Sequence, residues 1–112
     1  MKFLQAIQNN TLIITLQDEN LDTMNASSFK NEIIDLLEKT NCVNVIFDLG
    51  QLKFIDSSGL RAFLTIQRFL NQKDGIIKLA QLNPNVKSIL EIVSIHQIFE
   101  IFSKVEEALE SK

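Results

Sequence analysis

Two spacings of apolar residues alternate along the chain and predict alternating strands and helices. Short runs rich in β-branched and aromatic residues are typical of strands, whereas apolar residues three and four positions apart are typical of one helix face. The first pattern predicts strands over residues 2–8, 11–16, 43–49, 76–82 and 97–102. The second predicts helices that begin near Asn25, Ser57, Asn83 and Ser103.

Local signals place several helix ends. Asn25 or Asp22 is expected to cap the first helix, because short polar side chains accept hydrogen bonds from the first helical amides. Ser103 and Glu106 have the spacing of a capping box at the start of the last helix. Gly75 is expected to end the second helix as its left-handed C′ residue.

The order of elements predicts the fold class. Residues 2–8 and 11–16, joined by the turn former Asn9-Asn10, form an expected antiparallel hairpin. The later strands alternate with helices, which implies right-handed crossovers and parallel pairing. Residues 43–49 are apolar on both faces, as in a central strand covered on both sides. We therefore expect one α/β domain over residues 1–112, with a mixed, mostly parallel sheet, an N-terminal hairpin and about four helices.

The second helix, over about residues 57–72, has an unusually wide apolar arc. Residues expected to face the core are Leu60, Phe63, Leu64 and Leu70. Ala62, Ile66 and Phe69 lie at the edge of this arc. They form either further core or an exposed patch for a partner. Core is the favoured interpretation, because helices that pack on a sheet often bury a wide arc, and the partner-binding patch is the alternative.

Composition and charge exclude several classes of function. The 112 residues are 46% hydrophobic, which suffices for the core of one domain. Eleven scattered basic residues stand against 14 acidic ones, so we expect no nucleic acid partner. The single cysteine, Cys42, forms no internal disulfide and fits a reducing cytoplasm. No apolar run has the length of a membrane span, and no signal peptide is recognisable, so we expect a cytoplasmic protein without membrane insertion.

The segment Asp56-Ser57-Ser58-Gly59-Leu60 is the strongest candidate for chemistry. It joins a strand-like region to a helix, and open α/β sheets place their sites at such a junction. Free backbone amides and the helix dipole favour negative charge at a helix start. Two hydroxyls, a carboxylate and a glycine there suggest a site for a bound or covalently attached phosphate. The alternative is that the polar residues are ordinary helix caps and the glycine only permits close packing.

An enzymatic site has weaker support. A serine hydrolase would use Ser57 as nucleophile, yet the nucleophile elbow requires Gly-x-Ser-x-Gly and the sequence reads Ile55-Asp56-Ser57-Ser58-Gly59. The only histidine, His96, falls in a predicted connection. One histidine, one cysteine and dispersed carboxylates form no metal-ligand set, and no nucleotide-binding glycine motif is present. We expect no catalytic residue, no metal and no cofactor.

Residues 43–64 (VNVIFDLGQLKFIDSSGLRAFL) resemble the STAS domain family, and most closely its small single-domain members, the bacterial anti-sigma factor antagonists. In that family a V-x-x-D-L strand precedes F-x-D-S-S-G-L at a helix start. The matching residues are Val45, Asp48, Leu49, Phe54, Asp56, Ser57, Ser58, Gly59 and Leu60. Residues 83–90 resemble the family's third helix, and residues 21–26 resemble the entry to its first, so the resemblance covers nearly the whole chain.

The resemblance implies a phosphorylation-controlled binding switch. Unmodified protein would bind an anti-sigma factor that is a serine kinase, and so free a sigma factor to act in transcription. Phosphorylation of Ser57 would release the partner, and a PP2C-type phosphatase would reset the switch. The site would be supported by Asp56, which is expected to orient the Ser57 hydroxyl, with Ser58, Gly59 and Asp22.

Several alternatives stand beside the switch. Ser58 is favoured as a helix-start residue bonded to backbone, with a second phosphosite as the alternative. Asp22 either lies near the site or only caps the first helix. Residues 18–20 (Asp-Glu-Asn) replace a glycine that the family often has there, so partner contacts in this loop are expected to differ. STAS domains also serve as stress-signalling scaffolds and lipid-transport accessories, and an unphosphorylated role of that kind is the main alternative function.

Overall fold

The structure is a computed structural model that describes residues 2–92 and 99–111. Its elements in chain order are β1 (Phe3–Gln8), β2 (Thr11–Leu16), β3 (Asn20–Leu21), α1 (Ala26–Thr40), β4 (Asn44–Asp48), β5 (Phe54–Ile55), α2 (Ser57–Asn71), β6 (Ile76–Ala80), α3 (Pro84–Ile92), β7 (Glu100–Phe102) and α4 (Val105–Glu110). The predicted alternation of strands and helices is confirmed for these residues. Val93 and His96, which the sequence assigns to the third helix and the following connection, lie outside them.

The main sheet is mixed, as predicted. Its strand order is β1-β2-β4-β6-β7. The β1–β2 hairpin is antiparallel, and the three other neighbouring pairs are parallel. The β4 strand is central, which agrees with its apolar character on both faces. The α/β fold class with an N-terminal hairpin, and with four helices in residues 2–92 and 99–111, is therefore confirmed.

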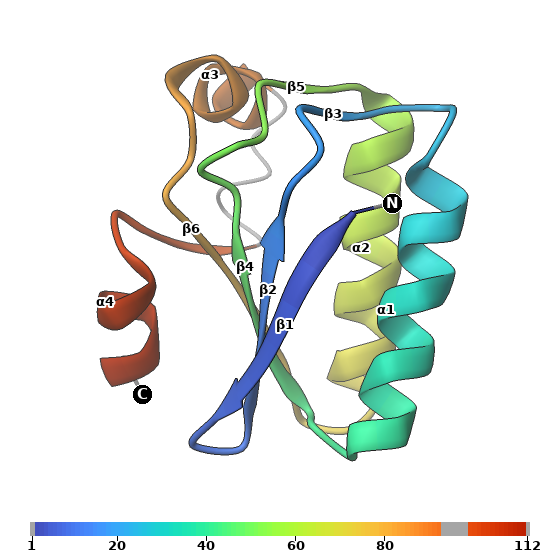
Figure 1. The fold of residues 1–112 in the computed structure, drawn as a ribbon, viewed down its shortest axis with the longest axis vertical. Helices are drawn as coiled ribbons and strands as arrows, with labels where there is room; N and C mark the ends of the chain where they lie inside the picture. Colours follow the sequence, from blue (N-terminus) through green and yellow to red (C-terminus); the bar gives the residue numbers. More distant parts are fainter. Residues whose placement is uncertain (1, 93–98, 112) are drawn as a thin grey trace.

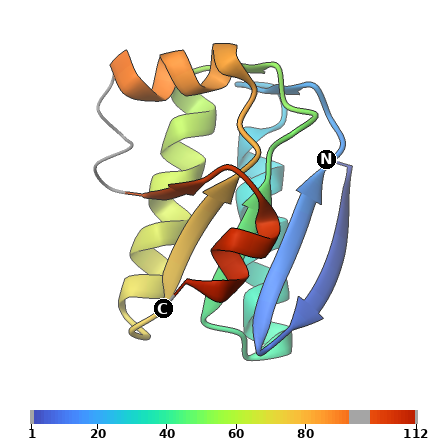
Figure 2. The same cartoon turned by 90° about the vertical axis from the view of Figure 1, so that its left-hand side faces the viewer.

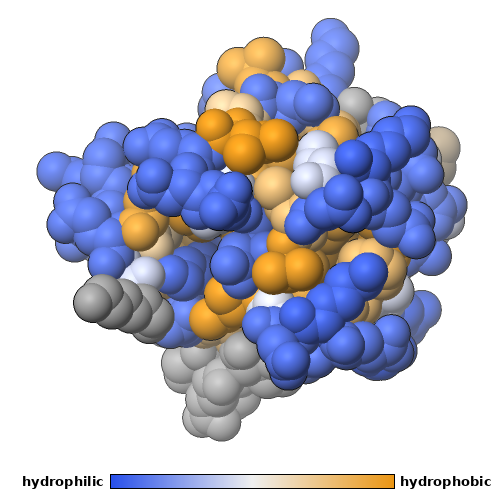
Figure 3. Space-filling model, turned by 90° about the horizontal axis from the view of Figure 1, so that it is seen from below, coloured by the Kyte–Doolittle hydropathy of each residue, from blue (hydrophilic) through white to orange (hydrophobic). Residues whose placement is uncertain are grey.

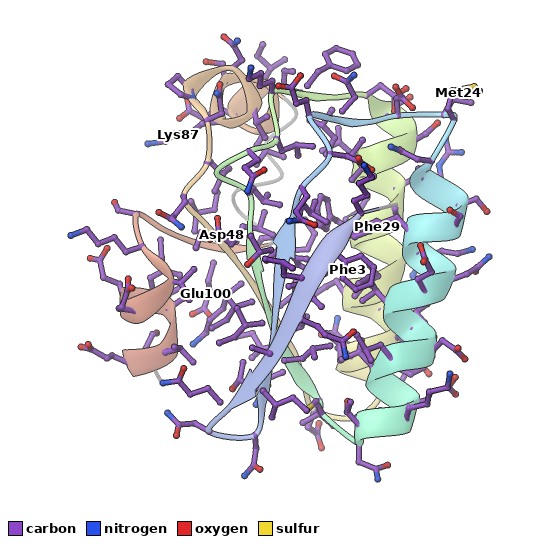
Figure 4. The ribbon with its side chains drawn as sticks, viewed as in Figure 1. Phe3, Met24, Phe29, Asp48, Lys87 and Glu100 are labelled. Atoms are coloured by element: carbon purple, nitrogen blue, oxygen red, sulfur yellow. The ribbon has the colours of Figure 1, made fainter. Side chains whose placement is uncertain are left out.

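The fold has three layers, with the sheet between two layers of helices (Figure 1, Figure 2). Helices α1 and α2 lie side by side on one face of the sheet, and the short α4 covers part of the other. Alternate β2 residues Leu12, Ile14 and Leu16 are fully buried, as the two-residue period of a strand predicts. Phe29 of α1 points into the layer between the helices and the sheet (Figure 4), where its ring centre lies 5.7 Å from that of Phe47.

A second sheet, of two strands, was not predicted from the sequence. Asn20 and Leu21 of β3 pair in parallel with Phe54 and Ile55 of β5. Each strand has only two residues, so no periodicity marks it. This small sheet lies at the end of the molecule where α1 and α2 begin (Figure 1), and it therefore fixes the two loops that enter those helices.

The partner-binding patch expected as an alternative on α2 is wrong. Ile66 is 0% exposed and Ala62 only 4%, and both belong to the main core. Phe69 is half-buried against the same core, with the Lys73 ammonium 5.2 Å from its ring centre. The physical reason is that α2 packs against both the sheet and α1, so a wide arc of its surface is covered. The favoured interpretation, further core, is confirmed.

Two predicted helix ends also need correction. The capping box is wrong, because Lys104 is the N-cap of α4 and no side chain caps it. Gly75 has no left-handed backbone; the preceding Asp74 does, with φ 57°. Gly75 is instead required by close approach, because a Cβ there would lie 1.8 Å from the Val43 carbonyl oxygen.

Candidate functional site

Parallel pairing of β3 with β5 builds the candidate site. Leu21 and Ile55 are register partners, so the residues that follow them, Asp22 and Asp56, leave the small sheet side by side. The Asp56 amide donates to the Leu21 carbonyl at 3.2 Å, which extends this pairing by one step. Ser57 then begins α2, at the same end of the molecule where α1 begins (Figure 1).

Asp56 caps α2 and also holds the loop before α1. Its Oδ1 accepts hydrogen bonds from the backbone amides of Ser58 at 2.9 Å and Gly59 at 3.0 Å. Its Oδ2 accepts from the amide and the hydroxyl of Thr23, at 3.1 and 3.2 Å. The Gly59 amide, opposed by desolvation and aided by Thr23 and Ser58, lowers the pKa of Asp56. The carboxylate therefore stays ionised at neutral pH.

Ser57 is exposed to solvent at the first helical position. Within residues 2–92 and 99–111 its hydroxyl forms no hydrogen bond, including none with Asp56. The expectation that Asp56 orients this hydroxyl is therefore wrong, because all four bonds to the carboxylate come from Thr23, Ser58 and Gly59. The geometry leaves the Ser57 oxygen free for an incoming reagent, next to a backbone that Asp56 holds in place.

Ser58 has a different partner from the one expected. Its side chain is half-buried, and its hydroxyl lies 3.1 Å from the Thr23 hydroxyl rather than on backbone. Thr23 thus contacts both Asp56 and Ser58 across a separation of 33 and 35 residues. The sequence offered no signal for Thr23, since a threonine in a polar loop is ordinary.

Gly59 permits the close approach of α2 to the small sheet. A Cβ at this position would lie 2.6 Å from the Leu21 carbonyl oxygen and 2.6 Å from Ile55 Cγ1. Both distances are too short for any real side chain, and the Leu21 oxygen belongs to the backbone that accepts from Asp56. The glycine is therefore a packing requirement of this site.

Asp22 builds the turn into α1. Its carboxylate accepts from the Met24 amide at 2.9 Å, and its carbonyl accepts from the amides of Asn25 and Ala26. Asn25 is the N-cap residue, and its side chain accepts from the Asp22 amide instead of capping the helix. Asp22 accordingly has a structural role in the loop, and register also places it beside Asp56.

The loop that departs from the family pattern is tied to the same small sheet. The Glu19 carbonyl accepts from the amides of Lys53 and Phe54, at 2.7 and 3.1 Å. The side chains of Glu19 and Lys53 form an exposed ion pair at 2.9 Å. Two exposed apolar side chains flank the site, namely Phe54 at 46% and Met24 at 91%. Met24 projects away from the molecule at this end (Figure 4).

A groove of about 250 Å³ runs between the first turns of α1 and α2. It is lined by Thr23, Ala26, Ser27, Lys30, Ser58, Arg61, Ala62 and Thr65. The end of the molecule that bears the site thus combines the exposed Ser57, a groove lined by two basic side chains, and two exposed apolar side chains.

Figure 3 shows the opposite end of the molecule, where apolar side chains lie between polar ones.

Other kinds of site find no support in the described part of the chain. Residues 2–92 and 99–111 contain no cluster of three or more metal-ligating side chains. In the same ranges, every helix falls short of the length and apolar character needed to cross a bilayer. His96, the only candidate base for a serine hydrolase, lies outside the described residues.

Comparisons with known proteins give a consistent result. A sequence model of the STAS domain matches residues 3–108. The anti-sigma F factor antagonist of Paenibacillus polymyxa is 29% identical over 98 residues, which cover 88% of this chain and 83% of that protein. BtrV of Bordetella bronchiseptica, provisionally named an anti-sigma factor antagonist, is 32% identical over 79% of this chain and 75% of its own.

The fold is shared with solved antagonists. Unphosphorylated SpoIIAA superimposes with a TM-score of 0.83 at 22% identity, covering 97% of this chain and 94% of its own. SpoIIAA has also been solved in its phosphorylated form, with a TM-score of 0.73 at 21% identity and 97% coverage of both chains. Proteins of this kind bind other proteins and are not enzymes, so the serine hydrolase alternative is set aside. Because the matched region spans residues 3–108, this chain belongs to the STAS domain family.

Proposed function

We propose that this protein is an anti-sigma factor antagonist switched by phosphorylation of Ser57. The unmodified protein binds an anti-sigma factor that is also a serine kinase, and this binding frees a sigma factor in the cytoplasm. The observation that carries the proposal is the free, exposed Ser57 hydroxyl at the start of α2, beside an Asp56 that rigidly caps the helix. The names of the relatives support the antagonist role.

The electrostatics of the site favour a switch that acts on binding and not on folding. A phosphate on Ser57 adds about −1.5 to −2 charges at pH 7. The start of α2 favours this charge by about 0.3–1 kcal/mol, whereas neighbouring Asp56 opposes it. Because Ser57 is exposed, water screens that repulsion in the free protein. We expect the fold to change little.

A partner docked over Ser57 would experience the phosphate differently. It would have to desolvate a dianion, which is costly unless the charge is paired. A loss of about 2.7–4.1 kcal/mol weakens binding about 100- to 1000-fold. Phe54 and Met24, which are exposed in the two segments that meet at Asp56, are suitable apolar contacts for such a partner. A PP2C-type phosphatase would return the protein to its binding form.

The proposal is tested by intact mass after incubation with ATP and the anti-sigma factor kinase of the same organism. We expect one added phosphoryl group on the wild type and on Ser58→Ala, and none on Ser57→Ala. Ser58→Ala is the matched control because it removes the adjacent hydroxyl of the same segment. The phosphorylated protein should then bind the kinase at least 100-fold more weakly by calorimetry.

Two results would contradict this function. Phosphorylation of Ser58 and not of Ser57 would show that Ser58 is the phosphoacceptor. Tight binding of a partner with no modification by a competent kinase would instead support a STAS scaffold or accessory subunit that works without phosphorylation. Mass spectrometry of the two serine variants detects the first result, and the second requires calorimetry of the unmodified protein with its partner as well.

A further inference from the structure

The groove between α1 and α2 is positively charged. Lys30 and Arg61 line it, and the six other lining residues are uncharged. Neither cation forms an ion pair within residues 2–92 and 99–111, although exposed lysines elsewhere do, as in Lys39 with Asp35. In a chain of net charge −3, this groove is therefore a local concentration of unpaired positive charge.

The remaining lining adds hydrogen-bond donors and little apolar surface. Within the described ranges the Ser27 hydroxyl has no partner, while Thr65 donates to the Arg61 carbonyl at 2.9 Å. Among the described residues, Ala26 and Ala62, at 5% and 4% exposure, contribute its only apolar side chains. The part of the chain that the structure describes places no aromatic side chain in the groove on which a nucleobase could stack. Its chemistry suits a small anionic group.

Ser58 lines the groove and Ser57 immediately precedes it in α2, so the groove lies next to the proposed phosphosite. We propose that the groove receives an acidic side chain of the protein partner, whose carboxylate pairs with Arg61 and Lys30. This inference rests on the proposed function and adds the chemistry of the partner's contact. Arg61 is the better anchor, because its guanidinium binds a carboxylate through two parallel hydrogen bonds.

The position of Arg61 also connects the groove to the switch. Arg61 follows Ser57 by four residues in α2, and residues with that spacing are neighbours on a helix surface. A phosphate on Ser57 therefore competes with the partner's carboxylate for the same guanidinium. Release of the partner then has two causes, which are the desolvation of the phosphate and the loss of Arg61 as a free cation.

The first test measures binding of the unphosphorylated protein to the kinase by calorimetry at low and at high salt. We expect Arg61→Gln to weaken binding about tenfold and Lys30→Gln several-fold, since close charge pairs at interfaces contribute measurably. Both variants should also show a smaller loss of affinity on adding salt. Arg68→Gln is the matched control, because it removes one charge from the same helix outside the groove, and it should bind like the wild type.

The second test follows the phosphate itself by phosphorus NMR on the Ser57-phosphorylated protein. A neighbouring guanidinium stabilises the dianion, so Arg61→Gln should raise the second pKa of the phosphoserine, and Arg68→Gln should not. This readout does not depend on partner affinity. Circular dichroism of each variant checks that the fold is intact.

Specific outcomes overturn the inference. If Arg61→Gln and Lys30→Gln bind as tightly as Arg68→Gln while Ser57 phosphorylation still releases the kinase, the groove is not the docking site and the switch stands. Equal weakening by all three variants would point to general charge attraction and would also overturn it. An unchanged phosphoserine pKa in Arg61→Gln would remove the competition step. Failure of the wild type to bind or to be phosphorylated would contradict the proposed function instead.

Discussion

At position 56 one carboxylate connects two segments that are 33 residues apart in the sequence. Oδ1 caps α2, and Oδ2 holds Thr23 in the loop before α1. A single residue thereby sets the conformation of both loops that surround Ser57. The two roles can be separated by substitution, because an amide retains one acceptor oxygen but replaces the other with a donor.

Substitutions at Asp56 should destabilise the protein in a defined order. Asp56→Asn keeps the cap on α2 but places an NH2 group against the two Thr23 donors, so we expect intermediate stability. Asp56→Ala loses every one of these bonds and should be less stable than Asp56→Asn. The midpoint of urea unfolding at pH 7 measures both. A midpoint for Asp56→Asn equal to that of the wild type would contradict a role for Thr23, and equal midpoints for the two variants would contradict a role for the helix cap.

The same residue should contribute to the acid sensitivity of the protein. The folded pKa of Asp56 lies below its ordinary value of 3.8, so its stabilising effect is complete above that pH. It is lost as the pH falls through the lowered pKa. Asp56→Asn should therefore lose less stability than the wild type between pH 4 and pH 2. Asp74→Asn, in a turn after α2, controls for removal of a carboxylate elsewhere.

At the scale of elements, the position of α2 depends on the absence of a side chain at residue 59. The helix start lies against β3 and β5, and the nearest backbone atom is the Leu21 carbonyl oxygen. That oxygen accepts from the Asp56 amide, so it cannot retreat without breaking the pairing of the two loops. The packing of α2 and the geometry of the serine turn are therefore coupled.

Gly59→Ala should destabilise the protein and displace the Ser57 turn. Inserting a methyl group into a closely packed contact costs about 1–3 kcal/mol. Urea unfolding measures the loss, and kinase-catalysed phosphorylation of Ser57 should slow in the same variant. Gly50→Ala is the control, because the nearest atom to its Cβ would be Asp48 Oδ1 at 3.3 Å, and the nearest backbone atom would be the Gln81 oxygen at 3.8 Å, an ordinary van der Waals distance. A stable Gly59→Ala protein with normal phosphorylation would show that α2 can shift freely.

At the scale of the whole molecule, three phenylalanines join the helical layer to the sheet. Phe29 of α1, Phe47 of β4 and Phe63 of α2 are all buried, with ring centres 5.1 to 5.7 Å apart. Tilted and edge-to-face pairs at such distances add to the stability that burial provides. Because the cluster joins both helices to the central strand, it links the site-bearing end of the molecule to its core.

Phe63→Ala should cost about 3–5 kcal/mol, the usual effect of truncating a buried phenylalanine. Domains of this size are stable by about 5–15 kcal/mol, so the variant should unfold at much lower urea concentration. Phe54→Ala is the matched control, because Phe54 is 46% exposed and should change stability by less than about 0.5 kcal/mol. Similar losses in the two variants would contradict the central role of the cluster.

Much of the fold could be predicted from the sequence because its signals are local and periodic. Phe29, Ile33 and Leu37 recur every four residues in the sequence, which is the spacing of one helix face, and all three are buried in α1. The apolar run of β4 predicted a central strand, and the sheet order confirms it. The β3–β5 sheet could not be predicted, since two-residue strands depend on a partner that is distant in sequence.

The residue pattern alone was enough to predict the order of the helices and of the main-sheet strands, the mixed sheet and the candidate Asp56-Ser57-Ser58-Gly59 segment. These follow from residue spacing and side-chain chemistry, which act within a few positions of the chain. Three features followed from tertiary packing: Ala62 and Ile66 are core, Thr23 is the partner of Asp56, and Lys30 and Arg61 share one groove. Each of these depends on how α1, α2 and the small sheet pack together, and such contacts between distant segments leave no local pattern in a single sequence.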